Sequence, residues 1–286
     1  TLENAEGFFS SIVNLDVSRV VNEKPNYDAD EFEEEGSEYQ IILRGDPTKR
    51  ASLLSTTIQS CMLIPRMLDK PGRGKHEGSL GIFGNKLFVF TDDLDNTNRL
   101  YDYILETEAY DQYRRPDPNA VPLADLRSTR AVANEVSYRD FWGQYWKSCE
   151  DIGHKLDDRL TVGRTTSSDP GVLDQANVIV ATAALEVGFN DPEVGAVLQH
   201  KSPRGLASYS QRRGRAGRTR EMRPIMVTVL SDFGRDRITF QNYERLFDPS
   251  LEAQHLPVEN SYVLKIQAVY SLFDWLALEA ESASLN

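Results

Sequence analysis

One segment of the sequence has side chains suited to bind a polyphosphate, Gln211-Arg-Arg-Gly-Arg-Ala-Gly-Arg218. In a helix, at about 100° per residue, Gln211, Arg215 and Arg218 share one stripe, whereas Arg212 and Arg213 point elsewhere. An amide and two guanidinium groups on one face offer many donors and a charge that persists at neutral pH. In phosphoryl transfer, such arginines neutralise charge on the transferred phosphate. We therefore expect Gln211, Arg215 and Arg218 to be catalytic residues at a nucleotide.

The alternative interpretation of this arginine run is an exposed basic helix that contacts nucleic acid or a membrane surface. Two features argue against it. The run contains Gly214 and Gly217, and a glycine costs about 1 kcal/mol against alanine inside a helix. The run also lies between two apolar, strand-like segments. Gly214 leaves room beside the stripe, and Gly217 is placed to end the helix.

Short apolar runs predict the elements that must position this segment. Strands are expected at 39–43, 87–91, near 161–162, and at 177–182, 194–199 and 224–230. Helices are expected at 49–69, kinked or ended by Pro65, and at 97–109, 138–156 and 204–217. Continuous apolar strands that alternate with helices predict an α/β fold, with a mostly parallel sheet flanked by helices.

Aromatic and apolar side chains stand out in the expected helix at 138–156 and in a further expected helix near the C-terminus. Aromatic side chains in 138–146 are expected to pack in the core in preference to stacking on bases. The last 50 residues carry apolar side chains at helical spacing on one face: Val263, Ile266, Val269, Tyr270, Phe273 and Leu276.

The charge of the chain is strongly segregated. The formal net charge is −12, which by itself argues against a nucleic-acid partner. Much of the acid lies at 28–38, whereas 201–223 holds eight basic side chains and one acid, Glu221. The acidic run is expected to be a solvated loop, and the basic cluster to be functional or tightly paired.

The order of three motifs resembles superfamily 2 helicases. Residues 211–218 resemble motif VI in its Gln-x-x-Gly-Arg-x-x-Arg form, residues 178–188 resemble motif V, and residues 87–91 resemble motif IV. Residues 167–169 fit the small polar turn before motif V. The resemblance covers roughly residues 80–231 and implies the C-terminal RecA-like lobe of an ATP-dependent nucleic-acid motor. Residues 185–192 and 199–203 resemble large bacterial phage-defence helicases of the DISARM type.

The resemblance also implies roles for single residues. Arg215 and Arg218 would be arginine fingers, and Gln211 would position the attacking water or close the lobe interface. The residues implied to contact the nucleotide are Gly188, Asn190, Asp191 and Arg212; Asn190 stands where many relatives carry Asp. Those implied to contact nucleic-acid phosphates are Thr91, Ser167 and Thr182. A strand-end Thr182 that bonds only its local backbone is an equal alternative.

The sequence contains no Gly-x-x-x-x-Gly-Lys-Ser/Thr loop and no Asp-Glu-x-His box. The resemblance therefore implies that ATP and Mg²⁺ are held mainly by an N-terminal helicase lobe of the same protein, and that the isolated chain is inactive. The other implied partners are a DNA or RNA backbone and subunits of a defence system. A non-catalytic helicase-like scaffold remains the alternative, and an unrelated α/β enzyme is a third.

Three regions are expected along the chain. Residues 1–79 form an extension, 80–231 form the lobe with an insertion at 111–156, and 232–286 form a helical extension. The longest apolar runs are too short to span a bilayer. Two distant cysteines and four scattered histidines indicate a reduced, cytoplasmic protein without a metal site or a membrane partner. The histidines are expected to lie at the surface or to be hydrogen-bonded in the core.

Overall fold

The structure, a computed structural model, describes residues 5–21, 38–45, 48, 52–70, 79, 81–132, 145–166, 173–186, 189–219, 221–247 and 260–284. The chain divides into two compact units. The larger unit is Asn26–Pro249, and the smaller one combines Thr1–Pro25 with Ser250–Asn286. The segment 211–218 belongs to the larger unit.

The larger unit is built on a six-stranded sheet with the order β1-β6-β5-β2-β4-β3. Every pair of neighbouring strands is parallel. The strands are β1 (Tyr39–Arg44), β2 (Lys86–Phe90), β3 (Val162–Thr165), β4 (Val178–Ala181), β5 (Val194–His200) and β6 (Ile225–Leu230). The central strands are buried along their whole length, as expected of strands covered on both faces. The predicted α/β class with a parallel sheet is confirmed.

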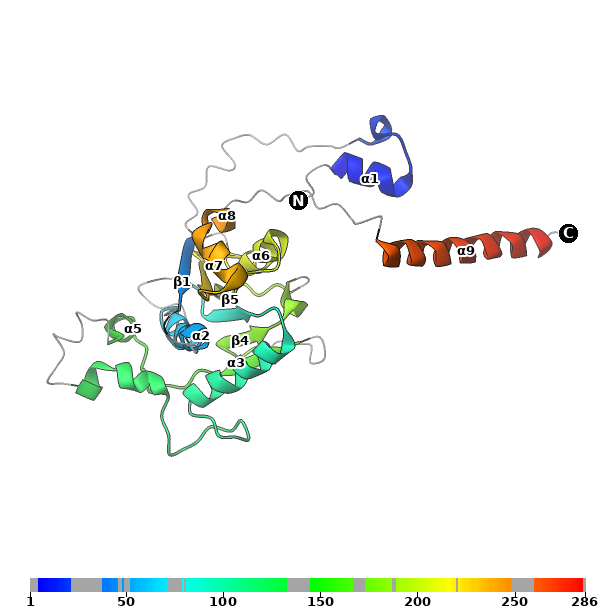
Figure 1. The fold of residues 1–286 in the computed structure, drawn as a ribbon. Helices are drawn as coiled ribbons and strands as arrows, with labels where there is room; N and C mark the ends of the chain where they lie inside the picture. Colours follow the sequence, from blue (N-terminus) through cyan, green and yellow to red (C-terminus); the bar gives the residue numbers. More distant parts are fainter. Residues whose placement is uncertain are drawn as a thin grey trace. The chain divides into compact units, whose positions relative to one another are not determined.

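Side chains alternate between the two faces of the sheet, and each face has its own apolar core. Leu87 and Val89 join the core beneath α2 (Ser52–Leu63) and α3 (Leu94–Thr107). Phe88 and Phe90 join the opposite core, which includes Tyr209 of α6 (Leu206–Arg213). Figure 1 shows α2 and α3 on one side of the sheet and α6, α7 (Gly234–Gln241) and α8 (Glu244–Phe247) on the other.

Several expected boundaries are changed by the structure. β1 pairs with β6, so the sheet extends beyond the expected lobe of 80–231 into the N-terminal extension. The helix expected over 49–69 ends at Leu63, and Pro65 lies in the 3₁₀ turn η3 (Ile64–Arg66), as a proline there predicts. Of the helix expected at 138–156, only α5 (Lys147–Asp151) is present among the described residues. The expected insertion 111–156 also contains η4 (Leu123–Arg127) and η5 (Thr129–Val132).

Two histidines lie in the core of the larger unit. His200 Nδ1 shares a hydrogen bond of 2.8 Å with the hydroxyl of Thr57, and burial lowers the pKa of His200 to about 4. His154 Nε2 donates to the carbonyl of Leu68 at 2.7 Å. Both side chains are buried. The expectation of hydrogen-bonded core histidines is confirmed for these two.

The smaller unit contains α1 (Ala5–Val13), the 3₁₀ turn η1 (Val17–Arg19) and α9 (Ser261–Ser284). The expected helicity near the C-terminus is confirmed by α9. Among the described helices, none combines the length and the apolar character that a bilayer span requires.

The start of β5 depends on a close backbone approach at Gly195. A Cβ on Gly195 would lie 1.5 Å from the carbonyl oxygen of Phe83, whereas one on Gly205 would meet no atom within 4 Å. We expect Gly195→Ala to destabilise the fold by more than about 4 kcal/mol, because backbone must move. Gly205→Ala should change the free energy of unfolding by less than about 1 kcal/mol. Urea unfolding midpoints measure both, and similar midpoints for the two variants would contradict this packing.

Candidate functional site

The segment 211–218 begins in a helix and continues as a turn. α6 ends at Arg213, with Gly214 as its C-cap. The amides of Arg215 and Ala216 donate to the carbonyls of Arg212 and Arg213 at 3.0 and 3.2 Å, which is the tighter spacing of a 3₁₀ turn. The expected helix over 204–217 therefore extends four residues too far at its C-terminal end and two at its N-terminal end. The prediction that Gln211, Arg215 and Arg218 lie on one face of a single helix is wrong, because the helix ends at Arg213.

The sequence predicted that Gly217 ends the helix, but α6 already ends at Arg213. Its φ of +72° is in the left-handed region, and an added Cβ would lie 2.8 Å from Pro224 Cγ. Its amide donates to the carbonyl of Val194, the first residue of β5, at 3.3 Å. Gly217 therefore brings the end of this segment to the amino edge of the parallel sheet.

Arg212 is the centre of a buried ionic network. Its Nη1 lies 2.7 Å from Asp92 Oδ1, just after β2, and 2.7 Å from Gln199 Oε1 in β5. Its Nε donates to Glu186 Oε1 at 2.7 Å, and its Nη2 contacts the same oxygen. Its guanidinium lies over the ring of Phe90. Arg212 is 3% exposed and its guanidinium is paired inside the protein, so its expected contact with a nucleotide stays a prediction.

The acids of this network have further cationic neighbours. Two carboxylates face the one guanidinium of Arg212, and the exposed Arg204 and Arg235 lie 3.9 and 3.8 Å from Asp92 Oδ2. Glu186 also accepts a hydrogen bond from the hydroxyl of Ser208 in α6 at 2.8 Å. The network therefore joins the ends of two strands, the segment after β4 and α6.

Arg215 is held by backbone carbonyls. Its Nη2 donates to the carbonyl of Glu186 at 2.6 Å, its Nη1 donates to that of Phe189, and its Nε donates to that of Gln211 at 3.3 Å. Burial and the nearby charge of Arg218 lower the pKa of Arg215, against the opposing effect of Glu186. Arg215 and Arg218 both follow the end of α6 at Arg213.

The other two predicted catalytic residues face solvent. Arg218 and Gln211 are exposed. Among the described residues, Arg218 has no hydrogen-bond or ion-pair partner. An unpaired guanidinium beside a second, carbonyl-bound one is a surface that can accept an anion.

The loop expected to contact a nucleotide lies at the same edge. Asn190 is exposed, whereas Asp191 accepts a bond of 2.7 Å from Lys86 Nζ at the start of β2. Burial lowers the pKa of Lys86, but hydrogen bonds and charge from Asp191 and Glu193 outweigh it and raise that pKa overall. Asp191 is thus paired within the chain. Gly188 lies outside the described residues.

The residues expected to contact nucleic acid follow strands at the opposite, carboxyl edge. Thr182 follows β4, is half-buried, and caps the turn η6 (Ala183–Leu185) without a side-chain hydrogen bond. Thr91 follows β2 but is fully buried; its hydroxyl bonds the carbonyl of Asp93 and the hydroxyl of Thr97. The Thr91 hydroxyl thus holds the start of α3, and its expected contact with nucleic acid stays a prediction. Ser167 lies outside the described residues.

Sequence reasoning missed the residues that support both edges. Asp92 is the second residue after the apolar strand β2, and Lys86 is its first residue; a charged residue at either end of a buried strand is a usable signal. Arg235, at the carboxyl edge, lies outside the basic cluster at 201–223. No local pattern marks Glu186 as a partner of Arg212.

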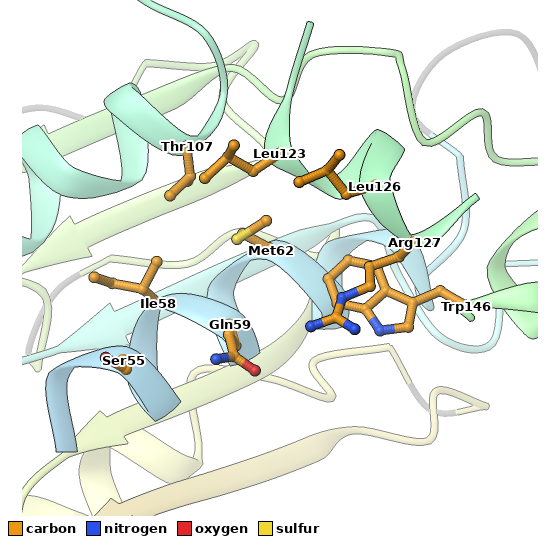
Figure 2. A pocket seen from close by; sticks show the side chains of 9 residues that line it. All are labelled: Ser55, Ile58, Gln59, Met62, Thr107, Leu123, Leu126, Arg127 and Trp146. Carbon is orange, nitrogen blue, oxygen red and sulfur yellow. The ribbon is translucent and has the colours of Figure 1, made fainter. Parts of the chain in front are cut away.

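A separate cavity of about 470 Å³ lies between α2, η4 and the residues before α5. Figure 2 shows Ile58 and Met62 facing Leu123, Leu126 and Trp146 across it. None of the predicted site residues lines it. Trp146 packs against the small apolar cluster around Met62 and Cys149. This is the core role expected for the aromatic segment, of which residues 138–144 lie outside the described ranges.

A search of the described ranges for three or more His, Cys, Asp or Glu side chains that could hold a metal ion finds no such group. The amino edge carries the guanidinium groups of Arg215 and Arg218 and the side-chain amides of Gln211 and Asn190. These groups bind and neutralise anionic oxygens.

Comparison with known proteins identifies part of this region. Residues 169–220 match the family model described as the helicase conserved C-terminal domain. The chain is 44% identical over 45 residues to the ATP-dependent DNA helicase Q-like 4B of Arabidopsis thaliana, which is 16% of this chain and 4% of the relative. It is 35% identical over 65 residues to the serine/threonine-protein kinase AKL1 of Saccharomyces cerevisiae, covering 22% of this chain and 6% of the relative.

Among solved structures, the helicase Lhr of Mycobacterium smegmatis bound to single-stranded DNA and AMP-PNP aligns with a TM-score of 0.47 at 15% identity. The alignment covers 78% of this chain and 23% of Lhr. The chain thus spans a small part of each of these relatives. The site lies in the part of the chain that is similar to a helicase C-terminal domain.

The ionic network yields a stability prediction. Arg212→Leu should destabilise the fold by about 3–5 kcal/mol, because it leaves the carboxylates of Asp92 and Glu186 without their buried partner. Arg204→Leu is the matched control, since the side chain of Arg204 is 71% exposed and should change stability by less than about 1 kcal/mol. Denaturant unfolding measures both. An Arg212→Leu variant as stable as the control would show that the network does not fasten the fold.

Proposed function

We propose that this chain supplies the second RecA-like lobe of a superfamily 2 helicase or translocase, driven by ATP and acting on a DNA or RNA backbone. One observation carries the proposal. Arg215 and Arg218 belong to the segment after α6 that Gly217 fastens to Val194 at the amino edge of the sheet, and this segment lies inside the match to the helicase C-terminal model. The family model is the sequence support, and the exposed guanidinium of Arg218 is the chemical support.

The amino edge fits the phosphates of ATP. Bound ATP supplies the phosphoryl group whose transfer to water releases the free energy that a motor uses. Arg218 is exposed and unpaired among the described residues, so we assign it the contact that neutralises charge on the transferred phosphate. Arg215, whose guanidinium is held by backbone carbonyls, adds a second positive charge. We assign the exposed side-chain amide of Gln211 to the positioning of the attacking water.

Other residues of the loop support this site in different ways. We assign a nucleotide contact to the exposed Asn190 and, by its motif position alone, to Gly188. Asp191 can make such a contact only by leaving Lys86. Arg212 is a positioning residue, because it fixes Glu186, whose carbonyl binds Arg215. Mg²⁺ is assigned to acidic ligands of the N-terminal lobe, the partner that completes the site.

The carboxyl edge is assigned to the nucleic-acid backbone. Thr182 offers a hydroxyl there, and Arg204 and Arg235 offer exposed guanidinium groups. Ser167 is included only by its position in the sequence. Backbone contacts of this kind fix position without reading sequence.

The wider assignments rest on sequence resemblance. We propose that residues 80–231 are the core of the lobe, to which β1 of the N-terminal extension 1–79 adds an edge strand, with 232–286 as a second extension and 111–156 as an insertion. A phage-defence origin of the DISARM type, with other defence subunits as partners, rests on residues 185–192 and 199–203. A cytoplasmic location is supported by two buried, free cysteines, Cys61 and Cys149.

A helicase-like scaffold without catalysis is the second candidate function. The pairing of Asp191 with Lys86 favours it, because an acid expected at the nucleotide is used within the chain. The net charge of −12 also favours a protein partner over nucleic acid. ATP hydrolysis by the complete protein separates the two functions, since only the motor requires Arg218.

In the complete protein that contains this chain, Arg218→Ala should lower nucleic-acid-stimulated ATP hydrolysis by about 10³-fold or more. The unfolding midpoint should stay the same, because Arg218 is exposed. Arg223→Ala is the matched control, an exposed arginine beside β6, and should keep the wild-type rate. Steady-state phosphate release measures all three proteins. Equal rates in Arg218→Ala and wild type would refute the assignment of Arg218.

The carboxyl edge gives a separate prediction. The double substitution Arg204→Ala with Arg235→Ala should weaken binding of single-stranded nucleic acid and reduce the slope of log affinity against log salt by about one to two. Hydrolysis at saturating nucleic acid should be retained. Fluorescence anisotropy at several salt concentrations measures the slope. An unchanged slope would place the nucleic-acid contact elsewhere on the chain.

A further inference from the structure

α9 carries a set of large apolar side chains that face solvent. Its 24 residues, Ser261–Ser284, include Tyr262, Ile266, Val269, Phe273 and Leu276, which are between 47% and 75% exposed. A patch of this extent is uncommon on a soluble surface and usually marks an interaction site. Lys265, Ile266, Val269, Tyr270 and Phe273 also line a shallow pocket along the helix.

The apolar side chains follow a heptad pattern. Steps of four and three residues alternate through the seam Tyr262, Ile266, Val269, Phe273, Leu276 and Ala280. This is the spacing by which one helix packs lengthwise against another. Val263, Tyr270 and Ala277 extend one side of the seam with apolar side chains. Gln267, Asp274 and Glu281 form a polar stripe away from it, whereas Leu264, Trp275 and Leu278 lie outside the seam.

We propose that the occupant of this seam is α9 of a second copy of the chain, packed antiparallel about a twofold axis at residue 271. In this register Tyr262 meets Ala280, Ile266 meets Leu276, and Val269 meets Phe273 of the second copy. The first and last of these layers pair a larger with a smaller side chain, which keeps the spacing between the helices even. The proposal does not depend on the proposed motor function.

Charge selects the antiparallel orientation. Beside the seam, on one side, lie Lys265, Leu272 and Glu279, seven residues apart. In the antiparallel register Lys265 faces Glu279 of the second copy, twice by symmetry, and Leu272 meets its own equivalent near the axis. In a parallel pair, Lys265 would instead face Tyr270, which carries no opposite charge. Flanking charges of this kind set orientation in paired helices.

The polar side of α9 disfavours a membrane surface as the occupant. Helices that lie on anionic lipid carry lysine and arginine on their polar face. The polar stripe here is Gln267, Asp274 and Glu281, and Lys265 is the only basic residue of α9. A second copy offers both the apolar seam and the acidic partner that Lys265 lacks within its own helix.

Charge reversal tests the register in the intact chain. Sedimentation equilibrium should give a dimer for the wild type. Lys265→Glu and Glu279→Lys should each raise the dissociation constant about tenfold, because two opposite-charge pairs become like-charge pairs. The double variant should restore the wild-type value. Glu281→Lys is the matched control: it makes the same charge change on the polar stripe and should have no such effect.

Cysteine cross-linking tests the orientation independently. Leu272→Cys should form a disulfide-linked dimer on mild oxidation, because the two equivalent side chains meet near the axis. Leu278→Cys, outside the seam, should not. The native Cys61 and Cys149 are buried and should remain free. A chain that is monomeric at all concentrations, a double variant that stays weak, or equal cross-linking of both cysteine variants would overturn the proposal.

Discussion

A guanidinium group buried between two carboxylates requires a fixed geometry, and Arg212 is placed in this way. Taking charges out of water costs several kcal/mol per ion, so the network is stable only while every partner stays within bonding distance. Its partners come from the residue after β2, from β5 and from the segment after β4. The orientation of α6 on the sheet is therefore set by charge pairing as well as by apolar packing. The orientation of α6 in turn sets the position of the turn that follows it.

The segment between β4 and β5 connects the two edges of the sheet. It begins with Thr182 at the carboxyl edge and ends where Asp191 pairs with Lys86 at the amino edge. Arg212 binds its middle through the side chain of Glu186, and Arg215 binds the carbonyl of the same residue. The described residues of this segment are thus bound to arginines of α6 and the turn after it: Glu186 to Arg212 and Arg215, and Phe189 to Arg215. Under the function proposed above, the segment would connect nucleic-acid contacts at one edge with nucleotide contacts at the other.

The strands were predictable because buried parallel strands read as continuous apolar runs, and β2, β4 and β5 are such runs. The arginine-rich segment 211–218 stood out by residue type and spacing, and its assignment to a nucleotide stays a prediction. The end of α6 was not, because the chain leaves the helix at Gly214 to bring Gly217 to Val194, a contact between distant segments. The burial of Arg212 could not be foreseen for the same reason, since Asp92 lies 120 residues away. Thr91 looked like an exposed strand end, yet its hydroxyl is enclosed by the first turn of α3.

Amide hydrogen exchange of an Arg212→Met variant tests most directly whether Arg212 fixes this site. Methionine keeps an unbranched apolar side chain and removes the guanidinium group. If the network holds α6 and its turn in place, the amides of Arg215, Ala216 and Gly217 will exchange about 100-fold faster. Amides of the central strands, such as those of Val180 and Leu198, will exchange through global unfolding, at a rate that rises steeply with urea, whereas those at 215–217 will exchange through a local opening that depends little on urea. Unaltered exchange at 215–217, or a dependence on urea there as steep as in the central strands, would contradict the role assigned to Arg212.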